Sequence, residues 1–439
     1  MKKNFINILV AILLVFSITA CNEITYPENL AVKPGSVAGK TFTEYEDLNI
    51  QPVAASLSEE YMRGVDASEV KALEECGIKF YDSDNTEKDV FEIFANHGVN
   101  WVRLRIWNDY TVAMNQTYGG LGDKYFAPYG WNNLSRTINM AKRAKANGLK
   151  VLLDFHYSDN WADPEKQFLP EMWSDVKTAE ELTEAVATYT KEIVIAMKEA
   201  DCAPEMIQLG NESEGGLFQK DYLGNALSFT PDVPACLVAA AKVIREELPN
   251  CKIMLHMSRG GNSNVLNNFL SNYVEKMIDG ETKLCDAVGL SYYPFYSSHK
   301  TIEDLVTNCN TIKEKGYEPV IAEISYCYDK EAWTDSTDNI FYETITNQTL
   351  TAQEQSGTNI PSLADANGKI EATIKNQALV VREVLEKTAA VGSTGIFYWG
   401  TCYLGVDDIM ASGYENQALF DVQGKVLPSM DVFAVEGTN

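Results

Sequence analysis

The stretch SRTINMAKRAKANGLKVLLDFH, residues 135–156, contains one unit of the pattern that determines the fold. Apolar residues recur at three- and four-residue spacing over Ser135–Ala146, which predicts an amphipathic helix. Asn147 and Gly148 then form a typical helix end. The apolar run Lys150–His156 follows at once and has the length of one buried strand, so this unit is a helix followed directly by a strand.

The same unit recurs from residue 58 onward, as short apolar runs separated by helical stretches such as Glu180–Glu199. Strands that alternate with helices form a parallel sheet, and eight units predict an α/β fold of the closed (β/α)8 TIM barrel type. An open, doubly wound sheet would need a glycine-rich turn after its first strand, and Gly64-Val65-Asp66 supplies none. The predicted strands are Met62–Val65, Val99–Ile106, Lys150–His156, Met206–Gly210, Lys252–His256, Ala287–Tyr293, Pro319–Ile324 and Gly395–Trp399.

The composition narrows the class of partner. With 45% hydrophobic and 22% charged residues, the 439-residue chain is globular and not disordered or collagenous. Its 36 Lys and Arg against 62 Asp and Glu give a formal net charge of -26, which would repel phosphate backbones. We therefore expect a neutral substrate, no nucleic-acid partner and a monomer.

The N-terminus has the layout of an export signal. Two lysines precede the apolar run Phe5–Phe16, which is short for a membrane span, and Ser17–Cys21 resembles the lipobox of bacterial lipoproteins. The alternative is an ordinary secretory signal with a chance cysteine. We predict a signal peptide over residues 1–20, a lipidated Cys21 with a flexible tether over 21–57, and a catalytic domain over 58–439. The protein is then exported and lipid-anchored to a bacterial membrane, at the outer membrane or the cell surface.

The remaining eight cysteines are scattered singly among apolar residues and form no CxxC pair. Most are predicted to be buried as small hydrophobic side chains, although an exported protein can also form disulfides that the sequence does not assign. No zinc-type cluster exists in the sequence, and we predict no metal ligand.

Two glutamates close apolar strands. Glu212 follows Ile207–Asn211, and Glu323 follows Val320–Ala322, at the ends of the fourth and seventh predicted strands. The carboxyl ends of barrel strands meet at one mouth, so the two side chains can flank one bond, as the hydrolysis of a glycosidic bond requires. A glutamate taken at random from so acidic a chain is a solvated surface charge, but burial after an apolar run is costly unless a site is built around the carboxylate.

Other polar residues end neighbouring strands. We expect His156 and His256 to hold sugar hydroxyls and to orient the glutamate pair, because no HxH or HxxE spacing favours the alternative of a metal pair. Arg105 is expected to donate to whichever of the two carboxylates is the nucleophile and to keep it ionised; a structural salt bridge is the alternative. Trp161 and Trp399 are predicted to form sugar-stacking surfaces, whereas core packing better explains Trp101.

Five motifs together resemble glycoside hydrolase family 53, the endo-β-1,4-galactanases, over about residues 63–428. They are Val102–Trp107, Asp154–Asp159 with Trp161–Pro164, Gly210–Glu212, Leu290–Phe295 and Glu415–Asp421.

The resemblance implies a clan-A barrel and a retaining endo-hydrolase of β-1,4-galactan in the type I arabinogalactan side chains of pectin. Carried over to this chain, Glu212 is the acid/base and Glu323 the nucleophile. Two alternatives stay open: a clan-A hydrolase of another neutral β-glycan, such as glucan or mannan, and a non-catalytic surface glycan-binding lipoprotein. The predicted supporting residues are Arg105, His156, Asp159, Trp161, Asp163, Asn211, His256, Tyr293 and Trp399.

The resemblance implies no required cofactor. Some family members carry a structural calcium between late strand-end loops, and oxygens of Asp335, Asp338 and Asn339 are candidates for such a site. Their spacing is not that of an EF-hand, and solvated loop residues are the preferred interpretation.

Overall fold

The computed structural model describes residues 42–52, 57–75, 77–108, 132–329, 359–404 and 414–435. Contacts group Met1–Ala31 and Val32–Asn439 as two units, and all described residues belong to the second. The predicted signal peptide, Cys21 and the candidate calcium oxygens of Asp335, Asp338 and Asn339 lie outside the described residues.

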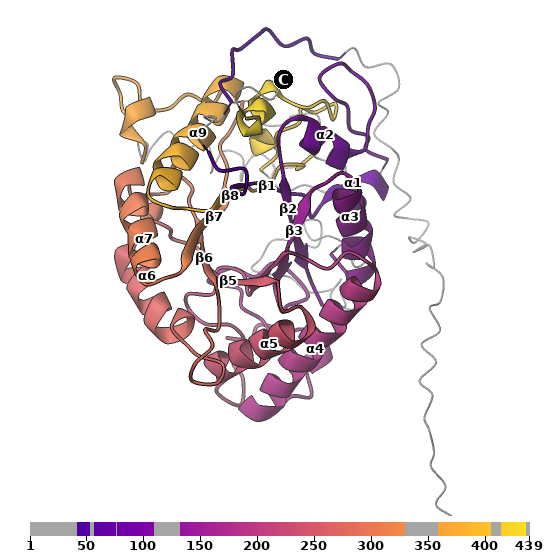
Figure 1. Cartoon of the computed structure of the whole chain (residues 1–439), viewed down its shortest axis with the longest axis vertical. Helices are drawn as coiled ribbons and strands as arrows, with labels where there is room; N and C mark the ends of the chain where they lie inside the picture. The colour runs from indigo at the N-terminus through magenta and orange to yellow at the C-terminus, as the bar shows by residue number, and fades with distance from the viewer. Residues whose placement is uncertain are drawn as a thin grey trace, which may run out of the picture. The chain divides into compact units, whose positions relative to one another are not determined.

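Eight parallel strands close into a barrel in chain order, with β8 paired to β1 (Figure 1). The TIM-barrel prediction is confirmed, and each predicted strand corresponds to an observed one with ends shifted by at most two residues. The strands are β1 (Met62–Asp66), β2 (Trp101–Ile106), β3 (Lys150–Phe155), β4 (Met206–Leu209), β5 (Lys252–Met257), β6 (Ala287–Ser291), β7 (Glu318–Ile324) and β8 (Gly395–Tyr398).

Helices surround the barrel on the outside (Figure 1). The threonines that precede α4 and α7 form capping boxes, which satisfy the first free N–H groups of each helix. Apolar residues on the inner helix faces pack against the outward-facing strand residues in one continuous core. The helices are α1 (Val70–Glu75), α2 (Val90–Asn96), α3 (Leu134–Ala146), α4 (Ala179–Glu199), α5 (Val233–Glu247), α6 (Ser263–Phe269), α7 (Ile302–Glu314) and α9 (Ile374–Ala390), and the short helical turns are η4 (Glu171–Trp173), η5 (Leu270–Val274), η6 (Ser297–His299), η7 (Pro361–Leu363), η8 (Glu415–Gln417) and η9 (Pro428–Phe433).

The barrel interior is filled by a second, separate apolar cluster near the amino ends of the strands. Phe397 fits there because Gly64 faces it, and a Cβ on Gly64 would lie 2.1 Å from the Phe397 ring. This floor closes the barrel from below, so the space above it opens only toward the carboxyl ends of the strands. Its members are Met62, Trp101, Leu152, Met206, Met254, Ala287, Val320, Ala322 and Phe397.

Residues 42–52, which the sequence analysis placed in a flexible tether, instead pack against the body. The Tyr45 hydroxyl donates to Asp421 at 2.8 Å, the Lys425 ammonium donates to the carbonyl of Thr43 at 3.0 Å, and the Phe42 ring lies 4.7 Å from that of Tyr81. These contacts come from isolated side chains without any apolar period, which is why composition alone suggested a tether. Any tether therefore ends before residue 42.

Seven cysteines of the described part are buried, as predicted for most of them, and all seven are free, which the sequence left open: Cys202, Cys236, Cys251, Cys285, Cys309, Cys327 and Cys402. In the same part of the chain, none of the helices combines the length and the apolar character needed to cross a membrane.

Candidate active site

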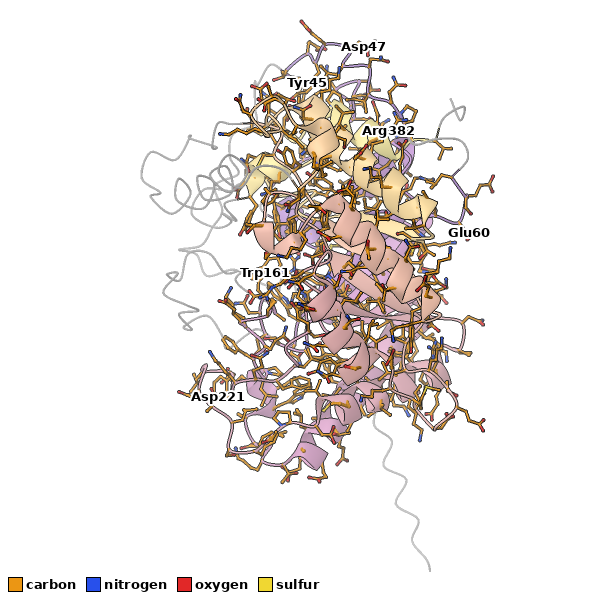
Figure 2. All side chains as sticks on the ribbon, turned by 90° about the vertical axis from the view of Figure 1, so that its left-hand side faces the viewer. Tyr45, Asp47, Glu60, Trp161, Asp221 and Arg382 are labelled. Carbon is orange, nitrogen blue, oxygen red and sulfur yellow. The ribbon has the colours of Figure 1, made fainter. Side chains whose placement is uncertain are left out.

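The predicted site residues gather at the carboxyl ends of the strands. Trp161 follows β3 and Asp221 follows β4, and both lie on one side of the body in Figure 2, whereas Glu60, just before β1, lies on the opposite side. Four of the strands that carry an apolar floor residue also carry a polar residue two positions later, on the same face. These steps are Trp101 to Arg103, Leu152 to Asp154, Met206 to Gln208 and Met254 to His256.

Glu212 is positioned by a tight turn after β4. Gly210 has φ of 82°, and a Cβ there would lie 2.8 Å from the Leu217 side chain. Glu212 itself has φ of 47°, a left-handed conformation that is uncommon for a residue with a side chain. Such local strain is typical of functional positions, because the surrounding structure must enforce it. The turn directs a partly buried carboxylate over the barrel mouth.

Glu323 reaches the mouth through an irregularity in β7. The register of β7 shifts between Ile321 and Ile324 against β8, and again opposite Ser291 of β6. As a result, Ala322 belongs to the apolar floor and Glu323, its neighbour, also faces inward. Strict alternation would have directed one of the two outward. The bulge thereby brings the second carboxylate, 5% exposed, into the site.

The two carboxylates lie close together, with an oxygen of each within 4.8 Å of the other and of a His256 nitrogen. This spacing is short compared with the roughly 6.5–9.5 Å of inverting glycosidases and fits the retaining geometry. Burial and the charge of Glu323 raise the pKa of Glu212 well above its usual value. Burial also raises the pKa of Glu323, but Arg103 and the Tyr293 hydroxyl oppose that rise, so Glu212 is the carboxyl that keeps a proton.

The arginine that holds Glu323 is Arg103, and the prediction that Arg105 does so is wrong. A guanidinium nitrogen of Arg103 lies 2.9 Å from Oε1 of Glu323. Both arginines face inward from β2, but Arg103 is one layer deeper and reaches across the barrel. Its further partners are Asp66 at 3.2 Å, Asp154 at 2.8 Å, Asn211 at 2.7 Å and Gln208 at 3.2 Å.

Arg105 turns toward β1 instead. It forms an ion pair with Glu69 and lies 3.7 Å from Asp66. Its guanidinium also stacks over Trp161, 3.9 Å from the ring centroid, and so covers one face of that indole. The structural salt bridge, the alternative for Arg105, is therefore the correct interpretation, and only the other face of Trp161 remains for a ligand.

The predicted residues of the loop after β3 support that loop and its neighbours. Nδ1 of His156 accepts from the Trp107 indole at 3.2 Å and from the Ala162 backbone at 3.0 Å, so its other nitrogen carries the hydrogen and faces Asp154 at 3.2 Å. Both nitrogens are thus used within the protein, which contradicts the expectation that His156 holds a sugar hydroxyl. It orients Asp154 instead.

Two predicted aspartates of the same loop, Asp159 and Asp163, differ in their place at the site. Asp159 accepts from the backbone N–H of Glu171 at 2.7 Å and so holds the first residue of η4. Asp163 pairs with Lys166 at 2.9 Å, and its charge contributes to the raised pKa of Glu212. Asp163 therefore lies near the mouth, whereas Asp159 stabilises the loop.

Asn211 and His256 are brought beside Glu212, as predicted. Asn211 accepts from Arg103 and donates to the Ala162 carbonyl at 2.8 Å, which fixes the turn that carries Glu212. His256 is fully buried, and burial together with the charge of Arg103 lowers its pKa well below the usual value. It therefore stays neutral and, with no exposed surface, cannot contact a sugar, so the expectation that His256 holds a sugar hydroxyl is wrong.

Glu212, His256 and Glu323 form a group whose ligand atoms are close enough to hold a metal ion. The hydrogen bonds argue for another role, because Nδ1 of His256 faces the backbone N–H of Glu212 at 3.3 Å and Nε2 faces the Ser291 hydroxyl at 2.9 Å. A neutral ring with both nitrogens so engaged has no lone pair directed between the carboxylates. The arrangement suits proton transfer and nucleophilic attack.

Aromatic side chains line the mouth around the carboxylates. Tyr293 donates its hydroxyl to Oε2 of Glu323 at 2.7 Å. The Trp399 ring lies 6.1 Å from that of Tyr293 and 6.3 Å from that of Trp161, and all three are only partly buried. The sequence analysis placed these three residues at the site, and the structure brings them together.

The sequence analysis missed Arg103, Gln208 and Ser291 as site residues. Each is a polar residue inside an apolar strand, in Val102–Leu104, Ile207–Leu209 and Leu290–Tyr292. That signal was available, because a buried polar side chain in a central strand needs partners that only an inward-facing site supplies.

Comparisons with known proteins agree with this geometry. The family model for glycosyl hydrolase family 53 matches residues 62–433. The chain is 29% identical to the endo-beta-1,4-galactanase of Bacillus subtilis, over 88% of each protein, and 27% identical to the arabinogalactan endo-beta-1,4-galactanase of Cellvibrio japonicus, over 85% of this chain and 90% of that one. Among solved structures, the GH53 catalytic domain from Ignisphaera aggregans matches with a TM-score of 0.70 and 32% identity, over 88% of this chain and 98% of that one.

Proposed function

Because the chain belongs to glycosyl hydrolase family 53, we propose that it is a retaining endo-β-1,4-galactanase that cuts galactan and the type I arabinogalactan side chains of pectin. It is a glycoside hydrolase with a clan-A barrel. The observation that carries the proposal is the pair of close carboxylates, one ion-paired with Arg103 and the other free of any arginine or lysine partner among the described residues.

In the first step, Glu212 protonates the glycosidic oxygen and Glu323 attacks the anomeric carbon. Burial and the charge of Glu323 keep a proton on Glu212, as its raised pKa requires for an acid. Arg103 and Tyr293 stabilise the ionised Glu323 and direct its oxygens. The bond from carbon to the leaving oxygen breaks as the bond to Glu323 forms.

In the second step, water attacks the anomeric carbon and the bond to Glu323 breaks. Glu212, which lost its proton in the first step, now accepts one from that water. Esterification removes the negative charge of Glu323, and this favours an ionised Glu212 at the moment when a base is needed.

The substrate class follows from charge and from the aromatic lining. The net charge of -26 disfavours polyanions, whereas the partly exposed rings of Trp161, Tyr293 and Trp399 offer apolar faces to the C–H faces of a neutral sugar. The galactanase names of the relatives make β-1,4-galactan the first polymer to test.

The test uses the soluble protein from residue 42, which keeps the packed N-terminal segment. It compares the oligosaccharides that this protein releases from β-1,4-galactan, β-glucan and β-mannan. We expect short oligosaccharides from galactan alone, and a loss of at least about 10³-fold in kcat for Glu323→Ala, because the nucleophile is gone. The matched control is Glu318→Ala, at the opposite end of β7. Cleavage of glucan or mannan at comparable rates would overturn the substrate, and intact folding without any cleavage would favour a glycan-binding protein.

We further propose that acyl chains on Cys21 anchor the protein to a bacterial membrane, at the outer membrane or the cell surface. The support is the charged and apolar layout of residues 2–20 before that cysteine. Radiolabelled palmitate should enter the full chain and not its Cys21→Ser variant; equal labelling of both would contradict the anchor.

A further inference from the structure

The hydroxyl of Ser291, the last residue of β6, lies between the two carboxylates. Its Oγ is 2.6 Å from Oε1 of Glu212 and 3.3 Å from Oε2 of Glu323. Ser291 is fully buried, and the register of β6 with β7 places it directly opposite Glu323. A serine hydroxyl carries one hydrogen, so it donates to one carboxylate at a time, and the shorter distance favours Glu212.

The hydrogen bonds of His256 determine the direction in which Ser291 donates. Nδ1 of His256 lies 3.3 Å from the backbone nitrogen of Glu212, whose N–H points at it and cannot rotate away, so Nδ1 is an acceptor. Oδ1 of Asn211 also lies 3.0 Å from Nδ1, but its two lone pairs already accept from Arg103 at 2.7 Å and from Gln208 at 3.1 Å. Nε2 therefore carries the ring hydrogen and donates to Oγ of Ser291 at 2.9 Å. The hydrogen of Ser291 is left for a carboxylate.

We propose that Ser291 is a positioning residue whose hydroxyl, oriented by His256, favours the ionised form of Glu212 and thereby sets the rate of the second chemical step. The claim about the rate of the second step rests on the proposed function. The claim that Ser291 favours the ionised form of Glu212 rests on the geometry alone. A hydrogen bond donated to a carboxylate stabilises the charged form, and it is stronger than one to a neutral group.

The two steps make opposite demands on Glu212, and Ser291 acts on the balance between them. Burial raises the pKa of Glu212 most, and the charges of Glu323, Glu214 and Asp163 add to the rise, whereas the Ser291 hydrogen bond lowers it. In the first step, the raised pKa is useful. In the second step, Glu323 is esterified, so burial and the charges of Glu214 and Asp163 still oppose the ionisation of Glu212, and the hydroxyl compensates part of that opposition.

The charged and polar groups that face Glu212 come from β3 to β7 and from the segment near the C-terminus. Ser291 is distinguished from them by donating a hydroxyl directly to a Glu212 oxygen. Those groups are Asp163 after β3, Glu214 after β4, His256 on β5, Tyr293 and Tyr296 after β6, Glu323 on β7 and Tyr414 near the C-terminus.

The experiment measures the ionisation of Glu212 without any substrate. Protein labelled with ¹³C at glutamate carboxyls is titrated by NMR, and Glu212→Gln identifies the resonance. We expect Ser291→Ala to raise the Glu212 midpoint by about one pH unit, the scale of one hydrogen bond to an ionised group. The control is Ser325→Ala, because Ser325 is an equally buried serine whose hydroxyl pairs with Gln417 and not with the carboxylates.

A kinetic measurement with an aryl β-galactoside tests the second step. The good leaving group needs little acid catalysis, so Ser291→Ala should show a burst of phenol and a lower steady rate. On galactan, whose leaving group does need the acid, the alkaline limb of kcat/KM should move to higher pH. Ser291→Thr, which keeps a hydroxyl, should restore both the midpoint and the rate.

The two readouts separate the possible failures. An unchanged Glu212 midpoint in a folded Ser291→Ala protein would overturn the proposal, as would an equal loss of rate at every pH without a burst. A raised midpoint in a protein that cleaves no galactoside would uphold the ionising role of Ser291 and reject the proposed function.

Discussion

Arg103 joins carboxylates from three strands at the barrel mouth: Asp66 of β1, Asp154 of β3 and Glu323 of β7. We expect Arg103→Lys to lower kcat by about 100-fold, because a lysine keeps the charge but cannot bridge three carboxylates in a planar fork. The acid limb of the profile of rate against pH should also move to higher pH, since Glu323 loses part of the stabilisation of its ionised form. Rates on galactan as a function of pH measure both effects.

Arg105→Lys is the matched control, one step along the same face of β2. Its partners are Glu69 and the Trp161 ring, so we expect KM to rise while kcat falls by less than about 10-fold. A larger loss of kcat in Arg105→Lys than in Arg103→Lys would contradict the assignment of Arg103 to Glu323.

At the scale of single residues, the sequence located both glutamates but not the arginine that pairs with Glu323. Glu212 and Glu323 follow apolar strands, and that pattern was sufficient to place both at the mouth. Arg103 and Arg105 share one face of β2, and period-two alternation cannot tell which layer of the barrel each occupies. The layer depends on the tilt of β2 against its neighbours, which is a property of the closed barrel and not of any one strand.

At the scale of elements, His97 fastens the C-terminal turn η9 to the end of α2. Its ring lies 2.5 Å from Asp431 of η9 and 2.9 Å from Asp82. Burial lowers the pKa of His97, but the two aspartates outweigh that effect and raise it above its usual value. For Asp82, burial is opposed by Lys88 and His97, and the pKa is lowered.

The pKa shifts set a pH window for this contact. The raised pKa of His97 makes its contribution to folding complete below about pH 6.5, the usual histidine value, and the contribution disappears as pH rises through the folded value. The lowered pKa of Asp82 makes its contribution complete above about pH 4 and lost on further acidification.

We therefore expect His97→Gln to lower the free energy of unfolding by on the order of 1 kcal/mol near pH 5.5, and by less at pH 8.5, where the ring of the native protein loses its charge. Urea unfolding at both pH values measures the difference. A loss that is the same at pH 5.5 and pH 8.5 would show that charge on His97 plays no part.

The elements themselves were well predicted because each strand and helix carries its own local pattern. The segment 42–52 was not, because its contacts join residues far apart in the chain, such as Tyr45 with Asp421, and leave no periodicity. The bulge in β7 could not be predicted either, because nothing in the sequence around Ala322 and Glu323 distinguishes a bulged strand from a regular one.

At the scale of the whole barrel, an apolar floor fills the interior and a polar layer above it supports the two carboxylates. The floor residues fill the lower barrel interior, and the next inward position on four of these strands supplies Arg103, Asp154, Gln208 and His256. These side chains bond one another and the one turn, after β4, that carries Asn211 and Glu212. The carboxylate pair is thus held by side chains that are themselves locked, which is what precise nucleophilic attack requires.

The role of Glu323 as nucleophile can be tested by trapping the covalent intermediate. A 2-deoxy-2-fluoro-β-galactobioside with a good leaving group slows both steps but allows the ester to accumulate. Mass spectrometry of the digested protein should find the added sugar on the peptide that contains Glu323, and NMR of the first product from natural galactan should show the β-anomer. A label on another residue, or no label together with an α-anomeric first product, would contradict the retaining pair of Glu212 and Glu323.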